Sequence, residues 1–329
     1  MESRVARVTM AAVQKPVQAE LDAVFTEMGR IISTDFPLIE EVNRHLLRIR
    51  GKMFRPTLLL LAAQATGRIT PRELTLGAVV ELIHLATLVH DDSVDHSALR
   101  RGQPTVNAQF SHEVAVIMGD YLYSRAIEEL VLLGSLEPLR IMSRVTNELT
   151  VGEMREVVAH DVLDFTEDDY ELLIEAKTAS LIAGACEVGA IGGSPEHRES
   201  LRLYGKNLGM AFQIVDDLLD YTATESITGK PSGQDLREHK ITLPLICAVP
   251  QMSRNERQQV ERLMAEPAPS DDLIGSIVRI VHARGGIAAG RERAQQFAML
   301  AEAELDSLPP GMARDALRDC LVYSIERRR

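Results

Sequence analysis

The sequence predicts an all-α protein, and three observations point to that class. Apolar residues recur with helical periodicity along most of the 329-residue chain. No convincing strand or hairpin signal interrupts this pattern. Hydrophobic residues make up 45% of the chain but aromatic residues only 4%, so the core should consist of Leu, Ile, Val, Ala and Met. Because no shift in composition marks a boundary, we expect a single domain over residues 1–329.

Capping residues predict where the long helices begin. Thr70 is followed by Pro71 and, three residues after the threonine, by Glu73. This pattern is typical of a capping box with proline at the first helical position. The helix that starts there should run to about Asp95.

Three further helices should begin after a hydroxyl residue that accepts hydrogen bonds from the first helical turn, at Ser111, Thr166 and Ser194. Glycines predict two of the helix ends. The helix after Ser111 should stop at Gly134, and the helix after Thr166 should reach about residue 190, before the glycine pair at residues 192–193.

Two copies of one acidic motif, DDSVD at residues 91–95 and DDLLD at residues 216–220, each follow a long apolar helical stretch. The first and last aspartates of each motif are four residues apart and share a helix face. Both motifs are expected at a helix C-terminus, where the macrodipole disfavours an anion by about 0.3–1 kcal/mol. This unfavourable placement of aspartates occurs twice, which indicates bound cations. Because the candidate ligands are oxygen atoms and no cysteine is nearby, Mg²⁺ is the expected ion.

Solvated helix ends are the alternative interpretation of these motifs. The runs that precede them, residues 82–90 and 210–215, are apolar nearly all round. Such helices are buried, so the aspartates should line an interior. We therefore expect the two acidic helices to face each other across a central cavity.

Basic residues beside glycine form two candidate anion sites, RGKMFRP at residues 50–56 and RRG at residues 100–102. Arginine can bind a phosphate through two hydrogen bonds and lysine as a point charge. Either patch alone could be a solvated face. Two anion sites beside two metal motifs, however, suggest two substrates that carry a diphosphate.

A third basic group comprises Lys177-Thr178 within a helix and Lys230 and Lys240 in the segment at residues 222–240. That segment is polar and contains Gly and Pro, which predicts an ordered loop or lid. Lysines on a lid could close over a metal-bound phosphate and exclude water. Ordinary loop solvation is the alternative for Lys230 and Lys240.

Composition excludes several other classes. The net charge of −12, from 36 basic and 48 acidic residues, argues against a nucleic-acid or membrane-surface binder. The three cysteines are far apart, as expected for buried free thiols in a reducing compartment. No signal-type segment and no apolar stretch of about 20 residues is evident, so we expect a cytoplasmic protein without an integral membrane segment.

In this order, the motifs resemble the trans-polyprenyl (isoprenyl) diphosphate synthase family over nearly the whole chain. The matched residues are Gly51-Lys52, Arg55-Pro56, residues 81–95, Arg100-Arg101-Gly102, Gly119-Asp120-Tyr121, Lys177-Thr178, Phe212-Gln213, residues 216–220, Gly229-Lys230, Asp235 and Lys240. One acidic motif alone would also fit a class I terpene cyclase. Both motifs with the basic elements between them are specific to the synthases.

The resemblance implies an isoprenoid synthase fold, a bundle of roughly a dozen helices around a deep cavity, usually homodimeric. It implies about three Mg²⁺ ions per active site with substrate bound, held by the catalytic residues Asp91, Asp95 and Asp216. Asp92, Asp217 and Asp220 would act through water or hydrogen bonds. Isopentenyl diphosphate would be bound by Lys52, Arg55, His84 and Arg101. The allylic diphosphate would be bound by Arg100, Lys177 (also catalytic), Thr178, Gln213, Lys230 and Lys240.

Two positions depart from the family pattern. Arg50 stands where the family has the first glycine of its Gly-Gly-Lys element, which should stiffen the loop or add a cation. His239 stands where the family has a glycine before the last lysine, so lid closure over Lys240 should differ. Neither departure removes a charged ligand.

The chemistry implied by the resemblance is ionisation followed by carbon–carbon bond formation. Pyrophosphate leaves an allylic carbocation, the isopentenyl double bond attacks it, and a proton is lost to the released pyrophosphate. An apolar cavity protects the cation from water.

Product length should depend on what stops the growing chain. Ala86 and Thr87 lie one turn before Asp91, where short-chain members of the family usually carry aromatic residues. Small side chains there predict a long product of about C30 to C50, near C40, the class used in respiratory quinones. The tunnel floor would then lie deeper, at Leu130 or Met142, unless these two are plain core residues.

Three alternatives are compatible with parts of the pattern. A farnesyl or geranylgeranyl diphosphate synthase would have the same motifs, but Ala86 and Thr87 speak against it. A non-catalytic partner subunit of a heteromeric prenyltransferase should have lost acidic or basic ligands, which are intact here. An EF-hand-like calcium site lacks its loop glycine and terminal glutamate.

Overall fold

Helical residues make up 82% of the chain in a computed structural model, which describes residues 8–48, 51–158, 164–222 and 233–326. The predicted all-α class is confirmed. Two compact units can be distinguished. The first comprises residues 1–144, 184–202 and 307–317, and the second comprises residues 145–183, 203–306 and 318–329. The expectation of a single domain over the whole chain stays a prediction.

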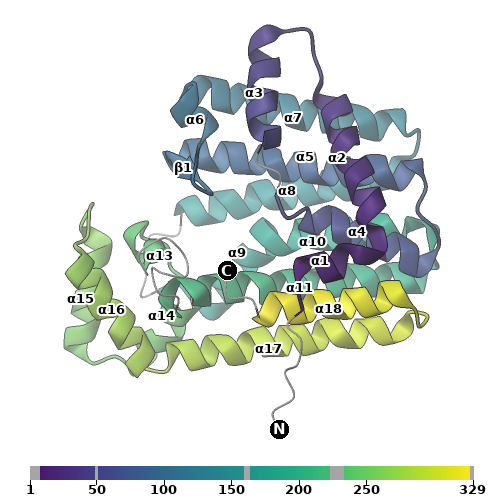
Figure 1. Cartoon of the computed structure of the whole chain (residues 1–329). Coiled ribbons are helices and arrows are strands. Elements are labelled where there is room, and N and C mark those ends of the chain that lie inside the picture. The colour runs from purple at the N-terminus through teal and green to yellow at the C-terminus, as the bar shows by residue number, and fades with distance from the viewer. Residues whose placement is uncertain (1–7, 49–50, 159–163, 223–232, 327–329) are drawn as a thin grey trace. The chain divides into compact units, whose positions relative to one another are not determined.

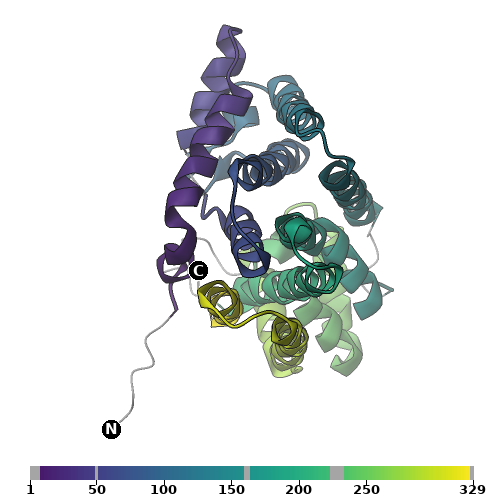
Figure 2. The same cartoon turned by 90° about the vertical axis from the view of Figure 1, so that its right-hand side faces the viewer.

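Helix α5, Pro71–Val94, is central to the first unit, where α2, α4 and α7 all pack against it (Figure 1, Figure 2). The other helices of the N-terminal part are α1 Met10–Gln14, α2 Gln18–Ile32, α3 Pro37–Arg48, α4 Phe54–Thr66, α6 Val106–Gln109 and α7 His112–Leu132, with a 3₁₀ turn at Lys15–Val17. Helix α8, Leu136–Val158, follows α7.

The predicted helix starts are confirmed by their caps. Glu73 accepts from the Thr70 backbone N–H at 2.8 Å, and the Thr70 hydroxyl accepts from Arg72 N, which together form the capping box of α5. Ser111 accepts from Val114 N at 3.2 Å at the start of α7. Each such cap stabilises its helix by about 1 kcal/mol, because it satisfies a backbone donor that has no partner within the helix.

Helix α5 also qualifies our expectation that no apolar segment could cross a membrane. By length and composition it could do so, with a mean hydropathy of 1.4 over 18 residues. Half of that window is buried in the structure, and α5 packs against α2, α4 and α7. The core helix of a globular protein has the same composition.

A short antiparallel hairpin follows α5, although the sequence was predicted to contain none. Strand β1, Leu99–Arg100, pairs with β2, Gln103–Pro104. Arg101 and Gly102 form the turn with φ values of 52° and 75°. Two positive φ values favour a tight hairpin turn. Strands of two residues are too short to show an alternating pattern, which is why the sequence did not predict them.

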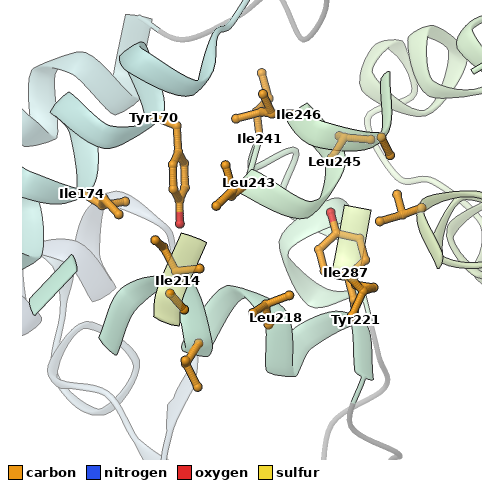
Figure 3. Packing of buried hydrophobic residues seen from close by; sticks show 14 of the residues in the cluster. Tyr170, Ile174, Ile214, Leu218, Tyr221, Ile241, Leu243, Leu245, Ile246 and Ile287 are labelled. Carbon is orange, nitrogen blue, oxygen red and sulfur yellow. The ribbon is translucent and has the colours of Figure 1, made fainter. Parts of the chain in front are cut away.

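The C-terminal part of the chain comprises α11, Pro195–Thr222, and the helices after it, most of whose residues belong to the second unit. These are α13 Gln234–Arg237, α14 Leu243–Ala248, α15 Arg254–Ala265, α16 Asp271–Ala283, α17 Gly286–Glu304 and α18 Met312–Glu326, with 3₁₀ turns at Val249–Gln251 and Leu305–Ser307. Figure 3 shows the core of this unit, where Ile214 and Leu218 on α11 meet Leu243 on α14 and Tyr170 on α9.

The helix predicted after Thr166 covers the expected range, but it contains a π turn that was not predicted. It consists of α9 Glu167–Ile174, a π-helical turn at Glu175–Ala179, α10 Ser180–Gly189 and a 3₁₀ turn at Ala190–Gly192. Two glycines explain the close packing of the π turn. A Cβ added at Gly209 would lie 2.6 Å from Ala179 Cα, and one at Gly152 would lie 2.9 Å from Lys177 N. Helices α11 and α8 therefore approach this turn at distances that only glycine permits.

Candidate active site

The first acidic motif ends helix α5, as predicted. Asp95 is its C-cap residue and donates its backbone N–H to the Asp91 carbonyl at 2.8 Å. Asp92 is buried, and both its carboxylate oxygens accept from Arg100 Nε, at 2.9 and 2.8 Å. The hairpin that follows α5 brings Arg100 back onto the motif. Asp92 is therefore neutralised by a full positive charge.

Three of the four residues predicted to bind isopentenyl diphosphate lie in one cluster, in which Arg55 and Arg101 are close both to Glu81 and to His84. They are Arg55 on α4, His84 on α5 and Arg101 in the hairpin turn. Burial raises the pKa of Glu81 and lowers the pKa of Arg55, and the attraction between their charges opposes both shifts. Burial and then the nearby Arg55 and Arg101 hold the pKa of His84 well below its usual value, so this imidazole is neutral at pH 7.

Among the described residues, this cluster contains one donor that an anion could use, Arg55 Nε, and one acceptor without a partner. Arg55 Nε and Glu81 Oε2 are buried without a hydrogen-bond partner in the part of the chain that the structure describes. A Cβ added at Gly51 would lie 3.1 Å from Arg101 Nη1, so the absence of a side chain at residue 51 leaves space beside this guanidinium group. Two guanidinium groups around one carboxylate leave a net positive charge. Lys52, the fourth predicted residue, is exposed just before α4.

In the second unit, the second acidic motif lies near the end of α11 and anchors a hydrogen-bond network. Asp217 is buried and accepts from the Tyr170 hydroxyl at 2.6 Å and from Gln213 Nε2 at 2.8 Å. Gln213 Oε1 in turn accepts from the Thr178 hydroxyl at 2.9 Å. Thr178 and Gln213, both predicted to bind the allylic diphosphate, are thus connected to the motif by hydrogen bonds.

Asp220 connects this motif to the chain after residue 232. Its carboxylate accepts from the backbone N–H groups of Gln234 and Asp235, at 2.9 and 3.0 Å, and its carbonyl accepts from Gly233 N at 3.0 Å. This clamp holds Asp235 close to Asp217. Burial, and then mutual repulsion among these acids, raises the pKa of Asp217 to about 7 and that of Asp235 to about 8.

Lys177 lies on the π turn and is held by two carboxylates of α8. Its Nζ donates to Glu153 at 2.9 Å and also to Glu156. π turns occur frequently at functional sites, because the extra residue redirects side chains. Lys177 was predicted from the sequence, whereas neither of these acidic partners was.

The remaining predicted residues are less well defined by contacts. Lys240 pairs with Glu238 at 2.9 Å. His239 adopts a φ of 58°, the left-handed conformation that a glycine would take more easily, and donates from Nε2 to the Glu266 carbonyl at 2.9 Å. Lys230 and Arg50 lie outside the described residues, as does most of the predicted lid at residues 222–240.

The predicted chain-length residues all belong to the first unit. Ala86 on α5, Leu130 on α7 and Met142 on α8 are buried. Thr87 is partly buried, and its hydroxyl donates to the His84 carbonyl at 2.8 Å. The side chain at position 87 is therefore tied to the same helical turn as His84.

Comparison with known proteins decides the family. The Polyprenyl synthetase family model matches residues 36–281. The chain belongs to the polyprenyl synthetase family. It is 37% identical to octaprenyl diphosphate synthase of Escherichia coli (strain K12), over 91% of this chain and 93% of that protein. It is 38% identical to all-trans-nonaprenyl-diphosphate synthase (geranyl-diphosphate specific) of Rhodobacter capsulatus, over 95% and 96%.

A solved structure supports the assignment. Polyprenyl synthase from Caulobacter crescentus CB15, crystallised with calcium and isoprenyl diphosphate, matches with a TM-score of 0.92 and 32% identity, over 98% of each chain. The isoprenoid synthase fold and the prenyltransferase class predicted from the sequence are thereby confirmed.

The family is Mg²⁺-dependent, and the acidic residues of this chain fit a hard cation. Within the described ranges, no three His, Cys, Asp or Glu side chains already converge as metal ligands do. The pKa values of Asp217 and Asp235 are raised by burial first and then by repulsion from neighbouring carboxylates. A divalent ion bound by carboxylate oxygens would relieve that repulsion.

Four polar residues near the predicted groups had no role assigned from the sequence: Glu81, Tyr170, Glu153 and Glu156. Tyr170 is a core tyrosine by pattern and shows no local signal. Glu81 lies in an apolar helical run ten residues before an acidic motif, which was a usable signal, since a buried charge requires partners. The pairing of Lys177 with α8 depends on tertiary packing and had no sequence signal.

Proposed function

We propose that this chain is a long-chain trans-polyprenyl diphosphate synthase, which condenses isopentenyl diphosphate head to tail onto an allylic diphosphate. The observation that carries the proposal is similarity over more than nine-tenths of the chain to octaprenyl and nonaprenyl diphosphate synthases. Both acidic motifs and the basic residues between them are present in this chain.

The two substrates would be bound by different groups. Arg55, His84 and Arg101, with Lys52, would hold isopentenyl diphosphate, which is supported by the positively charged cluster around Glu81. Arg100, Lys177, Thr178, Gln213, Lys230 and Lys240 would hold the allylic diphosphate. His84 would act as a neutral hydrogen-bond donor, because burial lowers its pKa.

Asp91, Asp95 and Asp216 would bind Mg²⁺, about three ions per site, and Asp92, Asp217 and Asp220 would support them by hydrogen bonds. Bound Mg²⁺ would neutralise the diphosphate and so favour its departure. The allylic carbon–oxygen bond breaks, a carbon–carbon bond forms with the isopentenyl double bond, and the proton is lost to pyrophosphate. Lys177 would donate to the departing diphosphate once it exchanges Glu153 and Glu156 for phosphate oxygens.

We propose a product near C40, set by the residues on the first-unit helices. Ala86 and Thr87 are small and leave room for the growing chain, and Leu130 and Met142 are buried residues that would form the floor. The two relatives above are named for octaprenyl and nonaprenyl products, which supports a long chain without fixing its length.

A homodimer in the cytoplasm completes the proposal. Helix α7 exposes Val116, Ile117 and Val131 to between 48% and 60%. Exposed apolar side chains repeated along one helix are typical of a protein–protein interface. The acidic net charge of −12 fits a protein that does not adhere to anionic membranes.

One assay tests this function. Purified protein is incubated with Mg²⁺, labelled isopentenyl diphosphate and farnesyl or geranylgeranyl diphosphate, and the dephosphorylated products are separated by thin-layer chromatography. A Mg²⁺-dependent ladder that ends near C40 is expected. A product that stops at C15 or C20 would favour the short-chain alternative, and no product would favour a non-catalytic partner subunit.

A further inference from the structure

A buried tyrosine beside the second acidic motif has no role in the function proposed above. The Tyr170 side chain is 1% exposed, within an otherwise largely aliphatic cluster. Figure 3 shows its hydroxyl directed toward the segment of α11 that carries Ile214. Burying a hydroxyl is costly unless it forms a hydrogen bond. This one donates to Asp217 Oδ2 at 2.6 Å.

The hydrogen bond between Tyr170 and Asp217 is one end of a chain of three hydrogen bonds. Asp217 Oδ1 accepts from Gln213 Nε2 at 2.8 Å, so the amide nitrogen of Gln213 is turned toward this motif. The Gln213 carbonyl oxygen then faces Thr178, whose hydroxyl donates to it at 2.9 Å. The network therefore runs from Tyr170 on α9, through two residues of α11, to the π turn that carries Lys177 and Thr178.

The π turn and α9 are parts of one helical stretch, which gives Tyr170 a mechanical connection to Lys177 as well. Tyr170 precedes Lys177 by two turns, and α9 begins at a capping box in which the Thr166 backbone N–H donates to Asp169 at 3.1 Å. The first turn of this stretch is thus fixed by its cap and by the Tyr170–Asp217 bond, and its π turn is fixed by the pairing of Thr178 with Gln213.

We propose that Tyr170 is a positioning residue for the allylic diphosphate, an inference that rests on the function proposed above. Its hydroxyl fixes the position of the Asp217 carboxyl group. Asp217 in turn keeps the Gln213 amide in one orientation, and the Gln213 carbonyl oxygen orients the Thr178 hydroxyl. Without the hydroxyl, Asp217 Oδ2 loses a buried donor and its carboxylate can rotate. The Gln213 amide is then free to reverse, and Thr178 loses the acceptor that orients it.

Tyr170→Phe tests this inference, because it removes the hydroxyl and keeps the ring. We expect the Mg²⁺ concentration for half-maximal activity and the KM for the allylic substrate to rise by about ten- to a hundredfold, as for other partners of metal-site residues. The KM for isopentenyl diphosphate should stay the same, since Arg55 and its cluster belong to the first unit. A purely structural role would lower kcat and leave both Mg²⁺ dependence and KM unchanged.

Tyr204→Phe is the matched control, since Tyr204 is an equally buried tyrosine of α11 that belongs to no part of the proposed site. Its Mg²⁺ dependence should match that of the unmodified protein. The proposal is overturned if folded Tyr170→Phe stays within about twofold of the unmodified protein, or if both variants change alike.

A double-mutant cycle with Thr178→Val keeps the test decisive should Tyr170→Phe lower the melting temperature. If the network transmits the effect, Tyr170→Phe should cost much less in kcat/KM for the allylic substrate once Thr178 is replaced. Additive effects, measured at reduced temperature on folded protein, would refute transmission. If the unmodified protein transfers no prenyl group, the proposed function fails, and calorimetric binding of Mg²⁺ and pyrophosphate to both tyrosine variants still decides the role of Tyr170.

Discussion

The two acidic motifs have the same spacing of aspartates but neutralise their middle aspartate differently. In each motif this residue is buried, with 6% of its surface exposed. Asp92 is paired with a guanidinium, because Arg100 Nε donates to both of its oxygens. Asp217 is surrounded by neutral donors, the Tyr170 hydroxyl and the Gln213 amide.

The two motifs therefore differ in how the buried carboxylate is compensated. Arg100 supplies a full positive charge to the first motif. The second motif receives only dipoles, and Asp235 adds a further carboxylate beside it, so that burial and repulsion raise the pKa of Asp217 to about 7 and that of Asp235 to about 8. We infer that the second motif gains more from a bound cation than the first.

The largest effect is expected at the proposed metal ligands, where both motifs should behave alike. Asp91→Asn and Asp216→Asn should each lower kcat/KM by about a thousandfold, or about 4 kcal/mol, because each removes a carboxylate that holds Mg²⁺ against the departing diphosphate. Labelled product formation measures this loss. Asp272→Asn, an exposed aspartate at the start of α16, is the control and should keep full activity. Retention of a tenth of the activity by either motif variant would contradict the assignment.

Product length should depend on the side chain at position 86, one helical turn before the first acidic motif. Ala86→Phe is expected to shorten the product by at least one isoprene unit, because the buried position one turn before Asp91 would be filled by a ring. Chromatography of the dephosphorylated products measures the shift. Thr87→Ala keeps a small side chain and should leave the length unchanged. An unaltered ladder from folded Ala86→Phe would remove the basis for the predicted tunnel.

Neutralising the middle aspartate should change stability in opposite directions in the two motifs. At pH 8 without metal, Asp92→Asn should lower the free energy of unfolding by about 1–3 kcal/mol, because it deprives Arg100 of its partner. Asp217→Asn should raise that free energy by up to about 1 kcal/mol, because it relieves repulsion with Asp235. Urea unfolding measures both changes. Changes of the same sign would show that the two motifs are electrostatically equivalent.

The acids of the second motif should also give the metal-free protein a characteristic pH dependence. A carboxyl group whose pKa is raised in the folded state binds its proton more tightly there than in the unfolded chain. Its contribution to stability is therefore greatest at low pH and is lost as pH rises from about 4 toward 8. In EDTA, the melting temperature should fall by a few degrees more over this range in the unmodified protein than in Asp217→Asn. Added Mg²⁺ should reduce the difference, and identical pH profiles would exclude the raised pKa values.

The smallest effect concerns His239, one of the two departures from the family pattern. His239→Gly relieves a φ of 58° but loses the bond to the Glu266 carbonyl, so its stability should change by less than about 1 kcal/mol. His239→Ala keeps the left-handed strain and loses the same bond. It should unfold at a lower urea concentration than His239→Gly, by the equivalent of about 1 kcal/mol. The reverse order would show that the left-handed conformation costs little here.

The sequence predicted helix starts and the content of the two motifs well, because both are local. Thr70, Ser111 and Thr166 cap the predicted helices through residues no more than three positions away. The π turn at Glu175–Ala179 was not predicted. Gly152 and Gly209, which pack closely against it, come from other helices. Hydrophobic periodicity carries no information about such an approach.

The partners of the site residues were also beyond prediction, for the same reason. Tyr170 is 47 positions from Asp217 in the chain, and Glu153 is 24 positions from Lys177. Arg100 is only eight positions from Asp92, but they meet through a hairpin whose strands are too short to be recognised. Residue types indicated which chemistry to expect, and tertiary packing determined which group supports which.

The clamp at Asp220 makes one aspartate responsible for where α13 begins. Three backbone N–H groups, of Gly233, Gln234 and Asp235, converge on this one residue. Backbone donors at the start of a helix have no acceptor within the helix, and here the Asp220 carboxylate accepts from two of them. A single replacement of Asp220 by alanine would therefore leave these two donors without their acceptor and would detach α13 from the motif.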